Sequence, residues 1–348
     1  MDLRVARGLW DPEPGWLDTA SYGLPPRPAW EELQAALDVW RHGRTNWHGW
    51  DESTHRARRA FAHLVHAQAD DVAVGSTVSG LLSVVAAALP AGARVVVPEI
   101  EFTSNLFPWL VHEDRGVTVA PVPPDALADA VDERTTLVAF SLVQSATGRI
   151  APYDEVIAAA RAHGALVCVD ATQACGWLPF DATRVDVFVC AAYKWLMAPR
   201  GVAFCYIHPD VRDRLRPLQA GWYAGEHVHE SYYGPPLRLA ASARRFDVSP
   251  AWFCFVGAAP ALELLGQVGV EAVGEHNVAL ANRFRAGLGL EPGASAIVNV
   301  DVPGAQERLR AAGVRASVRA GRVRASFHLY TTERDVDLAL EALSGRSP

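Results

Sequence analysis

Short apolar runs alternate with segments of helical periodicity between residues 71 and 207, and this alternation constrains the fold more than any other feature. Six runs are typical of buried strands, at residues 71–75, 94–97, 136–140, 165–169, 185–189 and 202–207. Helical periodicity follows three of them, at residues 79–89, 105–113 and 153–163. Continuous apolar strands separated by helices are typical of a mostly parallel sheet covered on both faces. We therefore expect an α/β domain that binds its ligands beyond the carboxyl ends of the strands.

The pattern changes after residue 250. A long helical stretch at 256–288 precedes predicted strands at 297–300, 316–318 and 323–327 and a final helix at 333–343. This order is typical of a smaller α+β domain attached through a connecting helix. We therefore expect a large domain over residues 16–255 and a small C-terminal domain over residues 256–348, which also takes in the N-terminal segment 1–15.

Charge and cysteine usage narrow the class of protein. The 348 residues include 32 lysines and arginines against 39 aspartates and glutamates, a formal net charge of −7, and no basic run, which argues against nucleic acid or an anionic membrane as partner. The N-terminus lacks the apolar core of a signal peptide, and the longest apolar stretch, 80–89, is too short to span a bilayer. Five cysteines without a CxxC pair predict buried thiols in the cytoplasm, and without HExxH no metal site is expected.

Two charged residues stand at or just past the ends of predicted buried strands. Lys194 is the only lysine of the chain, and burial lowers the pKa of a lysine, as a lysine that forms a Schiff base requires. Asp170 follows the strand at 165–169, where a carboxylate is costly unless a cation pairs with it. A protonated pyridine nitrogen is such a cation, although an aspartate there is also common as a helix N-cap. We therefore expect pyridoxal 5′-phosphate (PLP) on Lys194.

Further features suit a phosphorylated cofactor and an amino-acid substrate. Residues 75–80 form a small-residue turn between a strand and a helix, where backbone amides and the hydroxyls of Ser76 and Thr77 can hold a phosphate. The same residues are also ordinary helix caps. Gln173, three residues after Asp170, is within reach of a ring hydroxyl. Arg324 offers a bidentate fork to a carboxylate, whereas an arginine on a strand is more usually a surface residue.

With these residues in place, the chain resembles the class V aminotransferase group of fold-type I PLP enzymes, which includes cysteine desulfurases, kynureninase and isopenicillin-N epimerase. The resemblance runs over nearly the whole chain, and residues 185–205 fit the lysine signature of the group. One position departs from it, since Tyr193 stands where the group usually has His, Gln or Arg. The resemblance implies a mostly parallel seven-stranded sheet, a smaller α+β C-terminal domain, and a homodimer with active sites at its interface.

The resemblance also implies roles for individual residues. Lys194 would carry the cofactor, Asp170 would pair with its ring nitrogen, and Arg324 would bind the substrate carboxylate. The other matches are Ser76, Thr77 and Val78 at the phosphate, Phe102 in place of the stacking histidine of desulfurases, Gln144, Ser145 and Gln173 near the ring hydroxyl and substrate, and Ser249, whose hydroxyl would reach the phosphate of the neighbouring subunit.

Within the group, the chain is similar to the ergothioneine-pathway lyase that cleaves hercynylcysteine sulfoxide, over residues 193–196, 198–201, 220–226 and 244–252. That substrate carries a trimethylammonium group, which prefers aromatic faces. Trp47, Trp222 and Tyr223 lie in loop-like segments that would border the pocket, while most of the eleven tryptophans are expected in the core or the dimer interface. Either Tyr193 or Tyr223 would protonate the departing sulfur.

The implied reaction is a β-elimination from a cysteine-conjugate sulfoxide that yields ergothioneine, pyruvate and ammonia. A class V aminotransferase, or an epimerase-like enzyme acting on another amino acid, would use the same lysine and stays an alternative. Cysteine desulfurase is disfavoured, because that activity needs a mobile cysteine shortly before the carboxylate arginine and residues 313–324 contain none. A non-enzymatic regulator or scaffold would lack Lys194, Asp170 or Arg324, and this chain has all three.

Overall fold

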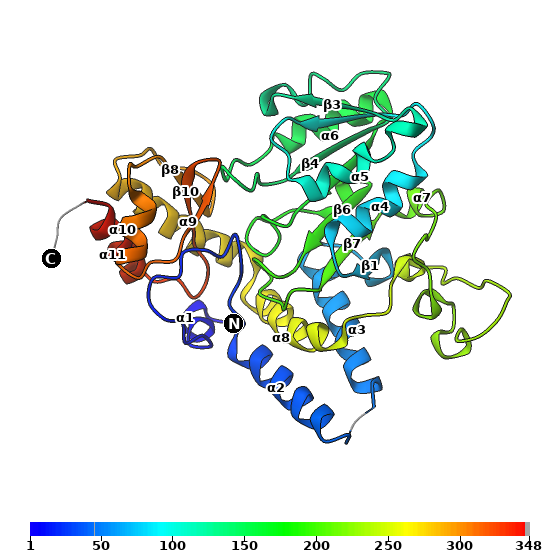
Figure 1. The fold of residues 1–348 in the computed structure, drawn as a ribbon, viewed down its shortest axis with the longest axis horizontal. Coiled ribbons are helices and arrows are strands. Elements are labelled where there is room, and N and C mark those ends of the chain that lie inside the picture. Colours follow the sequence, from blue (N-terminus) through cyan, green and yellow to red (C-terminus); the bar gives the residue numbers. More distant parts are fainter. Residues whose placement is uncertain (45, 345–348) are drawn as a thin grey trace.

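A seven-stranded sheet in the order β1-β7-β6-β5-β4-β2-β3 forms the centre of the fold (Figure 1). The computed structural model describes residues 1–44 and 46–344. The strands of the sheet are β1 Val72–Gly75, β2 Arg94–Pro98, β3 Thr118–Val122, β4 Leu137–Ser141, β5 Leu166–Asp170, β6 Val187–Ala191 and β7 Ala203–Ile207. β7 is antiparallel to both of its neighbours, and the pairs from β6 to β3 are parallel. The expected mostly parallel seven-stranded sheet is confirmed.

Helices cover both faces of this sheet, because alternate strand residues point to opposite sides. On β2, Val96 belongs to one hydrophobic cluster, while Val95 and Val97 belong to the other. One cluster lies under α4 (Val78–Ala88) and α5 (Phe107–Leu110). The other lies under α3 (His48–Leu64), α6 (Tyr153–His163) and α8 (Trp252–Val268). A sheet buried on both faces leaves its strand ends as the place for a polar site.

Three expectations about the elements need correction. The strand β3 was not expected, because its sequence TVAPV is only partly buried and contains a proline, unlike the continuous apolar runs of the other strands. The helix expected at 105–113 is reduced to short turns around α5, where Pro108 interrupts the pattern. The helix expected at 256–288 is two helices, α8 and α9 (Val270–Gly287), which meet at 86°. The break falls at Gly269, whose φ of 93° favours glycine.

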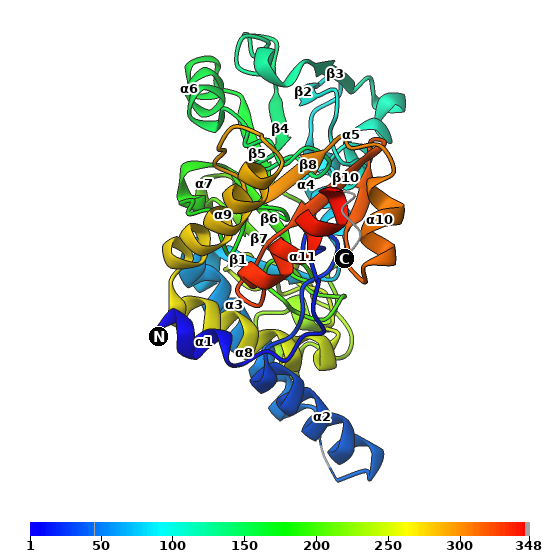
Figure 2. The same cartoon turned by 90° about the vertical axis from the view of Figure 1, so that its left-hand side faces the viewer.

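The smaller domain contains a three-stranded antiparallel sheet in the order β8-β10-β9, seen at one end of the molecule in Figure 1 and facing the viewer in Figure 2. Its elements are β8 Ile297–Val300, α10 Ala305–Ala311, β9 Ser317–Arg319, β10 Arg322–Ser326 and α11 Glu333–Ser344. The strands and final helix expected from the sequence are present. The residues 345–348 of the predicted small domain lie outside the described residues.

The N-terminal segment connects the two domains. After α1 (Leu3–Arg7), Trp16 and Asp18 form bridges with Arg315 and Ser326 of the small domain. The chain then crosses to the large domain and forms α2 (Arg27–Arg41), which packs on α8 and projects from the body (Figure 2). Because α8 packs on α3 as well, the predicted boundaries at residues 16 and 256 stay predictions.

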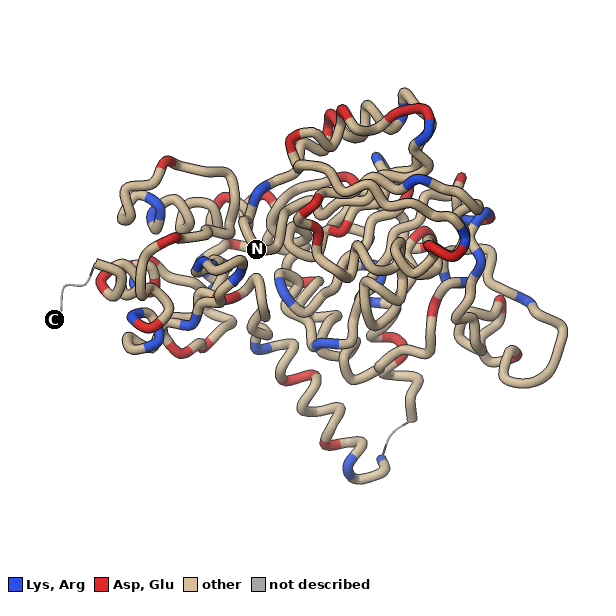
Figure 3. Tube along the Cα trace, turned by 45° about the horizontal axis from the view of Figure 1, so that its top comes forward, with Lys and Arg blue, Asp and Glu red and all other residues tan. Residues whose placement is uncertain are grey.

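Acidic and basic residues are interspersed along the described chain in both domains (Figure 3). Within the described residues, no single helix is long and apolar enough to cross a membrane. The helices α8 and α9 have that length and apolar character only when they are taken together, and they are sharply bent at their junction.

Candidate active site

The carboxyl ends of β4, β5 and β6 and the turn after β1 surround a cavity of about 210 Å³. Parallel strands end at the same edge of a sheet, which is why residues far apart in sequence meet here. The lining residues are Ser76, Thr77, Val78, Ser79, Phe102, Ser104, Ser141, Ser145, Asp170, Thr172, Gln173, Ala191, Tyr193, Lys194 and Arg200. Most residues predicted to bind a cofactor are therefore brought together.

Lys194 and Asp170 face this cavity as two buried charges, 6% and 4% exposed. Burial lowers the pKa of Lys194 to about 8, and Asp170 opposes that shift. Burial also raises the pKa of Asp170, whose Oδ1 accepts a hydrogen bond of 2.8 Å from the amide of Thr172. Among the described residues no cation forms an ion pair with Asp170. A buried carboxylate that lacks a cationic partner fits a protonated ring nitrogen.

The first turn of α4 closes the cavity on the side of β1. Thr77 caps this helix, and its Oγ1 accepts a hydrogen bond of 3.1 Å from the amide of Gly80. Ser76 and Thr77 are exposed to the cavity, and Val78 is the first residue of the helix. A helix N-terminus with neighbouring hydroxyls suits a phosphate. The residues present therefore fit the phosphate and the ring of the expected cofactor.

Phe102 lies where a ring could stack, with its centroid 5.5 Å from the Nζ of Lys194. The preceding residue, Glu101, fixes this position, because its carboxylate accepts hydrogen bonds from the amides of Phe102 (2.7 Å) and Ser141 (2.6 Å). Burial raises the pKa of Glu101 to about 7, and Asp170 adds to the shift. Neither Glu101 nor Ser141 was predicted from the sequence as a site residue. Ser141 directly follows the predicted strand at 136–140, whereas Glu101 stands four residues after the predicted strand at 94–97.

Gln173 is held by the protein on all sides. Its Nε2 donates to the carbonyl of Ala20 (3.0 Å) and to Ser145 Oγ (3.1 Å), and its Oε1 accepts from the indole of Trp195 (2.8 Å). Both amide hydrogens therefore have protein acceptors. Its hydrogen bond to a ring hydroxyl stays a prediction. In the structure described here, Gln173 orients Ser145 and anchors the N-terminal segment.

Gln144 does not line the Lys194 cavity, and its predicted place near the ring hydroxyl stays a prediction. Its Nε2 donates to the carbonyl of Ile100, and its Oε1 accepts from the amide of Thr147 at 3.0 Å. It lines a neighbouring, mainly apolar cavity instead. The physical reason is the tight turn at residues 144–148, which needs the Gln144 amide as an internal cap.

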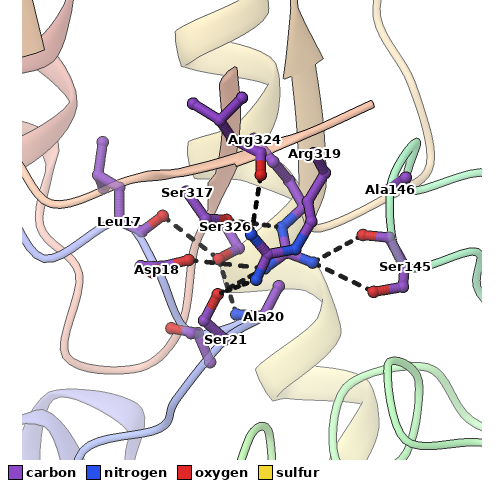
Figure 4. A network of polar contacts seen from close by, with 12 residues as sticks. Leu17, Asp18, Ala20, Ser21, Ser145, Ala146, Ser317, Arg319, Arg324 and Ser326 are labelled. Atoms are coloured by element: carbon purple, nitrogen blue, oxygen red, sulfur yellow. Dashed lines mark hydrogen bonds and ion pairs between the residues drawn. The ribbon is translucent and has the colours of Figure 1, made fainter. Parts of the chain in front are cut away.

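Arg324 lies on β10 and its side chain is 1% exposed (Figure 4). Its Nε donates to Ser317 Oγ (3.1 Å), its Nη1 to the Ser145 carbonyl (2.7 Å) and its Nη2 to Ser21 Oγ (2.7 Å). Asp18 Oδ1 lies 3.6 Å from Nη2. Burial lowers the pKa of Arg324 to about 10, with a contribution from nearby Arg319. A substrate carboxylate could reach this fork only by replacing a protein oxygen, so the predicted role of Arg324 stays a prediction.

The N-terminal segment, which the sequence analysis did not connect with the site, lies against it. The amide of Gly23 donates to the carbonyl of Tyr193 (3.0 Å), and the ring of Tyr22 lies 5.7 Å from that of Tyr193. Arg200 covers the Tyr193 ring at 4.9 Å. Tyr193 is thus half-buried between a tyrosine and a guanidinium at the rim of the cavity. Burial raises the pKa of its hydroxyl.

The aromatic residues expected to border the pocket do not line it. Trp47 stacks on Trp252, with centroids 5.2 Å apart and planes at 9°, and meets Trp222 edge-on at 5.8 Å. Tyr223 is buried and donates to Asp51 Oδ1 at 2.6 Å. Trp47 is the N-cap residue of α3, and in this chain these aromatic rings contact one another instead of the cavity. Burial raises the pKa of Tyr223, and its role as the acid for the sulfur stays a prediction.

Ser249 is exposed and stands apart from the cavity of its own chain, and its contact with a second subunit stays a prediction.

Comparisons with known proteins agree with this geometry. The family model described as aminotransferase class-V matches residues 39–311. The uncharacterized aminotransferase YcbU of Bacillus subtilis is 28% identical over 92% of this chain and 91% of its own length. Isopenicillin N epimerase of Streptomyces clavuligerus is 27% identical over 83% and 84%.

Two solved structures share the fold. The cystine C-S lyase C-DES, in complex with its product cysteine persulfide, superposes with a TM-score of 0.87 at 21% identity, covering 97% of this chain and 98% of its own. The cysteine desulfurase CsdA of Escherichia coli superposes with a TM-score of 0.85 at 20% identity, covering 99% and 98%.

Proposed function

The chain belongs to the class V aminotransferase family, whose cofactor here is PLP, and we propose that it is a carbon–sulfur lyase acting on a cysteine-conjugate sulfoxide. The proposed substrate is hercynylcysteine sulfoxide. One observation carries the proposal: the ionisable residues around the cavity are Asp170, Tyr193, Lys194 and Arg200, with no thiol among the described lining residues. Such a site can remove an α-proton and support elimination, but it has no sulfur atom to accept a persulfide.

Different residues of the cavity would hold the ring and the phosphate of the cofactor. Bound PLP supplies an electron-withdrawing ring that makes the α-proton of the attached amino acid acidic. Asp170 would hold the positive charge on the ring nitrogen, and Ser76 and Thr77 with the first turn of α4 would hold the phosphate. Phe102 would cover one face of the ring.

Lys194 is the proposed base. Its Nζ is buried, and burial lowers its pKa to about 8, so a useful fraction is neutral near that pH. The rings of Phe102 and Tyr193 lie beside this amine, at 5.5 and 5.7 Å from ring centroid to Nζ, and form part of its surroundings in the cavity.

Tyr193 is the proposed acid for the leaving group. Burial raises the pKa of its hydroxyl, which keeps the proton in place until a developing sulfur anion takes it. The C–S bond then breaks with its electron pair on sulfur, and the sulfur leaves as a sulfenic acid. A thiol reductant from solution would supply the two electrons that convert it to ergothioneine, and hydrolysis of the three-carbon remainder gives pyruvate and ammonia.

An aminotransferase is the second candidate, because the relative from Bacillus subtilis, similar over 92% of this chain, carries that description. A panel of cysteine, alanine, kynurenine and hercynylcysteine sulfoxide on the holoenzyme separates the two. We expect pyruvate and ammonia from the sulfoxide without any keto acid. A product from alanine alone, and only with a keto acid, would reject the lyase in favour of the aminotransferase.

We further propose that the enzyme is a homodimer in which Ser249 approaches the phosphate of the partner subunit. The exposure of Ser249 and of the apolar residues Tyr233 and Leu237 supports this proposal. Light scattering is expected to give twice the mass of the 37.6 kDa chain. Ser249→Ala should weaken cofactor binding without changing that mass, and a monomeric holoenzyme would reject the proposal.

A further inference from the structure

Two guanidinium groups share one hydroxyl beside the Lys194 cavity. The Nη2 atoms of Arg324 and Arg319 both donate to Ser21 Oγ, at 2.7 and 3.2 Å, and Figure 4 shows the two side chains directed toward this serine. The remaining contact of the Arg319 fork is its Nη1 bond to the neighbouring Val318 carbonyl, at 2.8 Å. Hydroxyl and carbonyl oxygens satisfy hydrogen bonds but leave the positive charge of Arg319 uncompensated.

Positive charge exceeds negative charge around this serine. Asp18 forms an ion pair with Arg324, with its Oδ1 at 3.6 Å from Nη2. Arg319 forms no ion pair within residues 1–44 and 46–344. The pKa of Lys194 is lowered chiefly by burial, and both arginines contribute to that shift, so their charges act on the cavity. Adjacent like charges with one counter-charge favour an anionic ligand.

The β9–β10 turn holds Arg319 in this position. Arg319 is the last residue of β9 and pairs with Arg322, so the turn contains only Ala320 and Gly321. Their φ angles of 48° and 75° have the positive sign that tight two-residue hairpins require. Ser317 and Arg319 share a face because they are two residues apart, and Ser317 pairs with Arg324. The backbone therefore directs both arginines to the same side.

Exposure separates the two arginines. Arg324 is enclosed and bonds to Ser145, which lines the cavity, so it belongs to the inner end of the site. Arg319 is exposed and belongs to the outer end. We propose that Arg319 binds a second acidic group of the substrate, carried on the sulfur substituent, and so selects cysteine conjugates that are acidic at both ends. This inference rests on the proposed lyase function and names its substrate class.

The test compares ligands of equal size that differ by one charge. S-carboxymethylcysteine is compared with S-carbamoylmethylcysteine, and S-(2-carboxyethyl)cysteine with its amide. The two comparisons place the acidic group at two different distances from the sulfur atom. Dissociation constants are measured from the change in the visible spectrum of the holoenzyme, at low salt, and do not require turnover. Wild type should bind the acid roughly five- to thirtyfold more tightly than the amide at one or both lengths, as expected for a charge-assisted hydrogen bond.

Arg319→Gln should remove this preference and leave the affinity for the amides within about twofold. Arg319→Lys keeps the charge without the fork and should retain part of the preference. Arg322→Gln is the matched control. Arg322 stands in the same hairpin, but its guanidinium forms an ion pair with Asp301 at 3.1 Å. This control should keep the wild-type preference. Added salt should reduce the preference in wild type.

Two outcomes would overturn the inference. One is a wild type that does not prefer the acid at either length. The other is an Arg319→Gln variant that loses acid and amide affinity equally, which would assign Arg319 to the α-carboxylate shared by all four ligands. Failure of the proposed lyase reaction would give a different result. If the enzyme catalyses no elimination, and Arg319→Gln still removes the preference for acids, the proposed reaction is rejected while the second acidic-group site is supported.

Discussion

The α-carbon of Gly23 lies against the backbone of Lys194, so close that a methyl group on Gly23 would lie 1.9 Å from the Lys194 carbonyl oxygen. The amide of Gly23 also donates to the Tyr193 carbonyl at 3.0 Å. The N-terminal segment therefore fixes the turn that presents the lysine, and it brings Ser21 to Arg324 a few residues earlier. A contact between backbones positions both the proposed base and the proposed carboxylate site.

Gly23→Ala should disturb this contact, because the added carbon meets a backbone atom that cannot move aside. We expect a loss of about 1–3 kcal/mol of unfolding free energy, as for other overpacked positions. Activity should fall more than stability, because the Lys194 turn must shift. Gly49→Ala is the control, since a methyl group on Gly49 in α3 meets no atom within 4 Å. It should be neutral or slightly stabilising. Equal stability and activity of the two variants in denaturation and turnover assays would contradict the contact.

Lys194→Met should abolish turnover, by more than about a thousandfold, because the proposed base is removed. The cofactor-free protein should nevertheless become more stable at pH 7. The folded pKa of Lys194 is about 8 against an ordinary 10.5, so the buried charge destabilises the folded state fully below pH 8 and ceases to do so as pH rises to 10.5. The gain should approach roughly 3 kcal/mol at pH 7. Urea denaturation of both apo-proteins at pH 7 measures it, and residual turnover near the wild-type rate would contradict the assignment.

Glu101→Gln should change the pH dependence of stability. The folded pKa of Glu101 is about 7 against an ordinary 4.5. The stabilisation by its proton is therefore complete below pH 4.5 and is lost as pH rises through 7. The glutamine variant, which is neutral throughout, should gain up to roughly 3 kcal/mol relative to wild type between pH 4.5 and pH 8. Chemical denaturation across this range measures the effect, with the exposed Glu99→Gln as control. Parallel curves for wild type and Glu101→Gln would contradict it.

Asp247→Asn should be strongly destabilising. Asp247 is fully buried, its Oδ2 lies 2.6 Å from Arg58 Nη2, and its Oδ1 accepts from the Val74 amide at 2.8 Å. Removing one charge leaves Arg58 buried and unpaired, which costs about 3–5 kcal/mol. Asp213→Asn breaks the exposed pair with Arg245 and should cost no more than about 1 kcal/mol. Similar urea denaturation midpoints for the two variants would show that burial does not decide how much stability is lost when an ion pair is broken.

Much of the candidate site was predictable from local sequence. Asp170 is the last residue of β5 and the Ser76–Thr77 turn directly follows β1, while Lys194 and Phe102 stand three and four residues beyond β6 and β2. In a parallel sheet those ends converge at one edge, so the order of strands and polar residues along the chain is sufficient to bring them together. The family resemblance then supported the cofactor already expected from Lys194 and Asp170, because the motifs of the family lie near these same strand ends.

Contacts between distant segments were not predictable in this way. Ser21 and Gly23 approach Arg324 and Lys194 from the other end of the chain. Trp47 and Trp222 turned to one another instead of to the pocket. The connecting helix bends by 86° at Gly269. The sequence by itself thus determined the sheet, Lys194 and the buried carboxylate of Asp170, since strand periodicity and the cost of buried charge are local. Only the tertiary structure decided which arginine is enclosed and which is exposed, because that depends on how the N-terminal segment and the β9–β10 hairpin pack together.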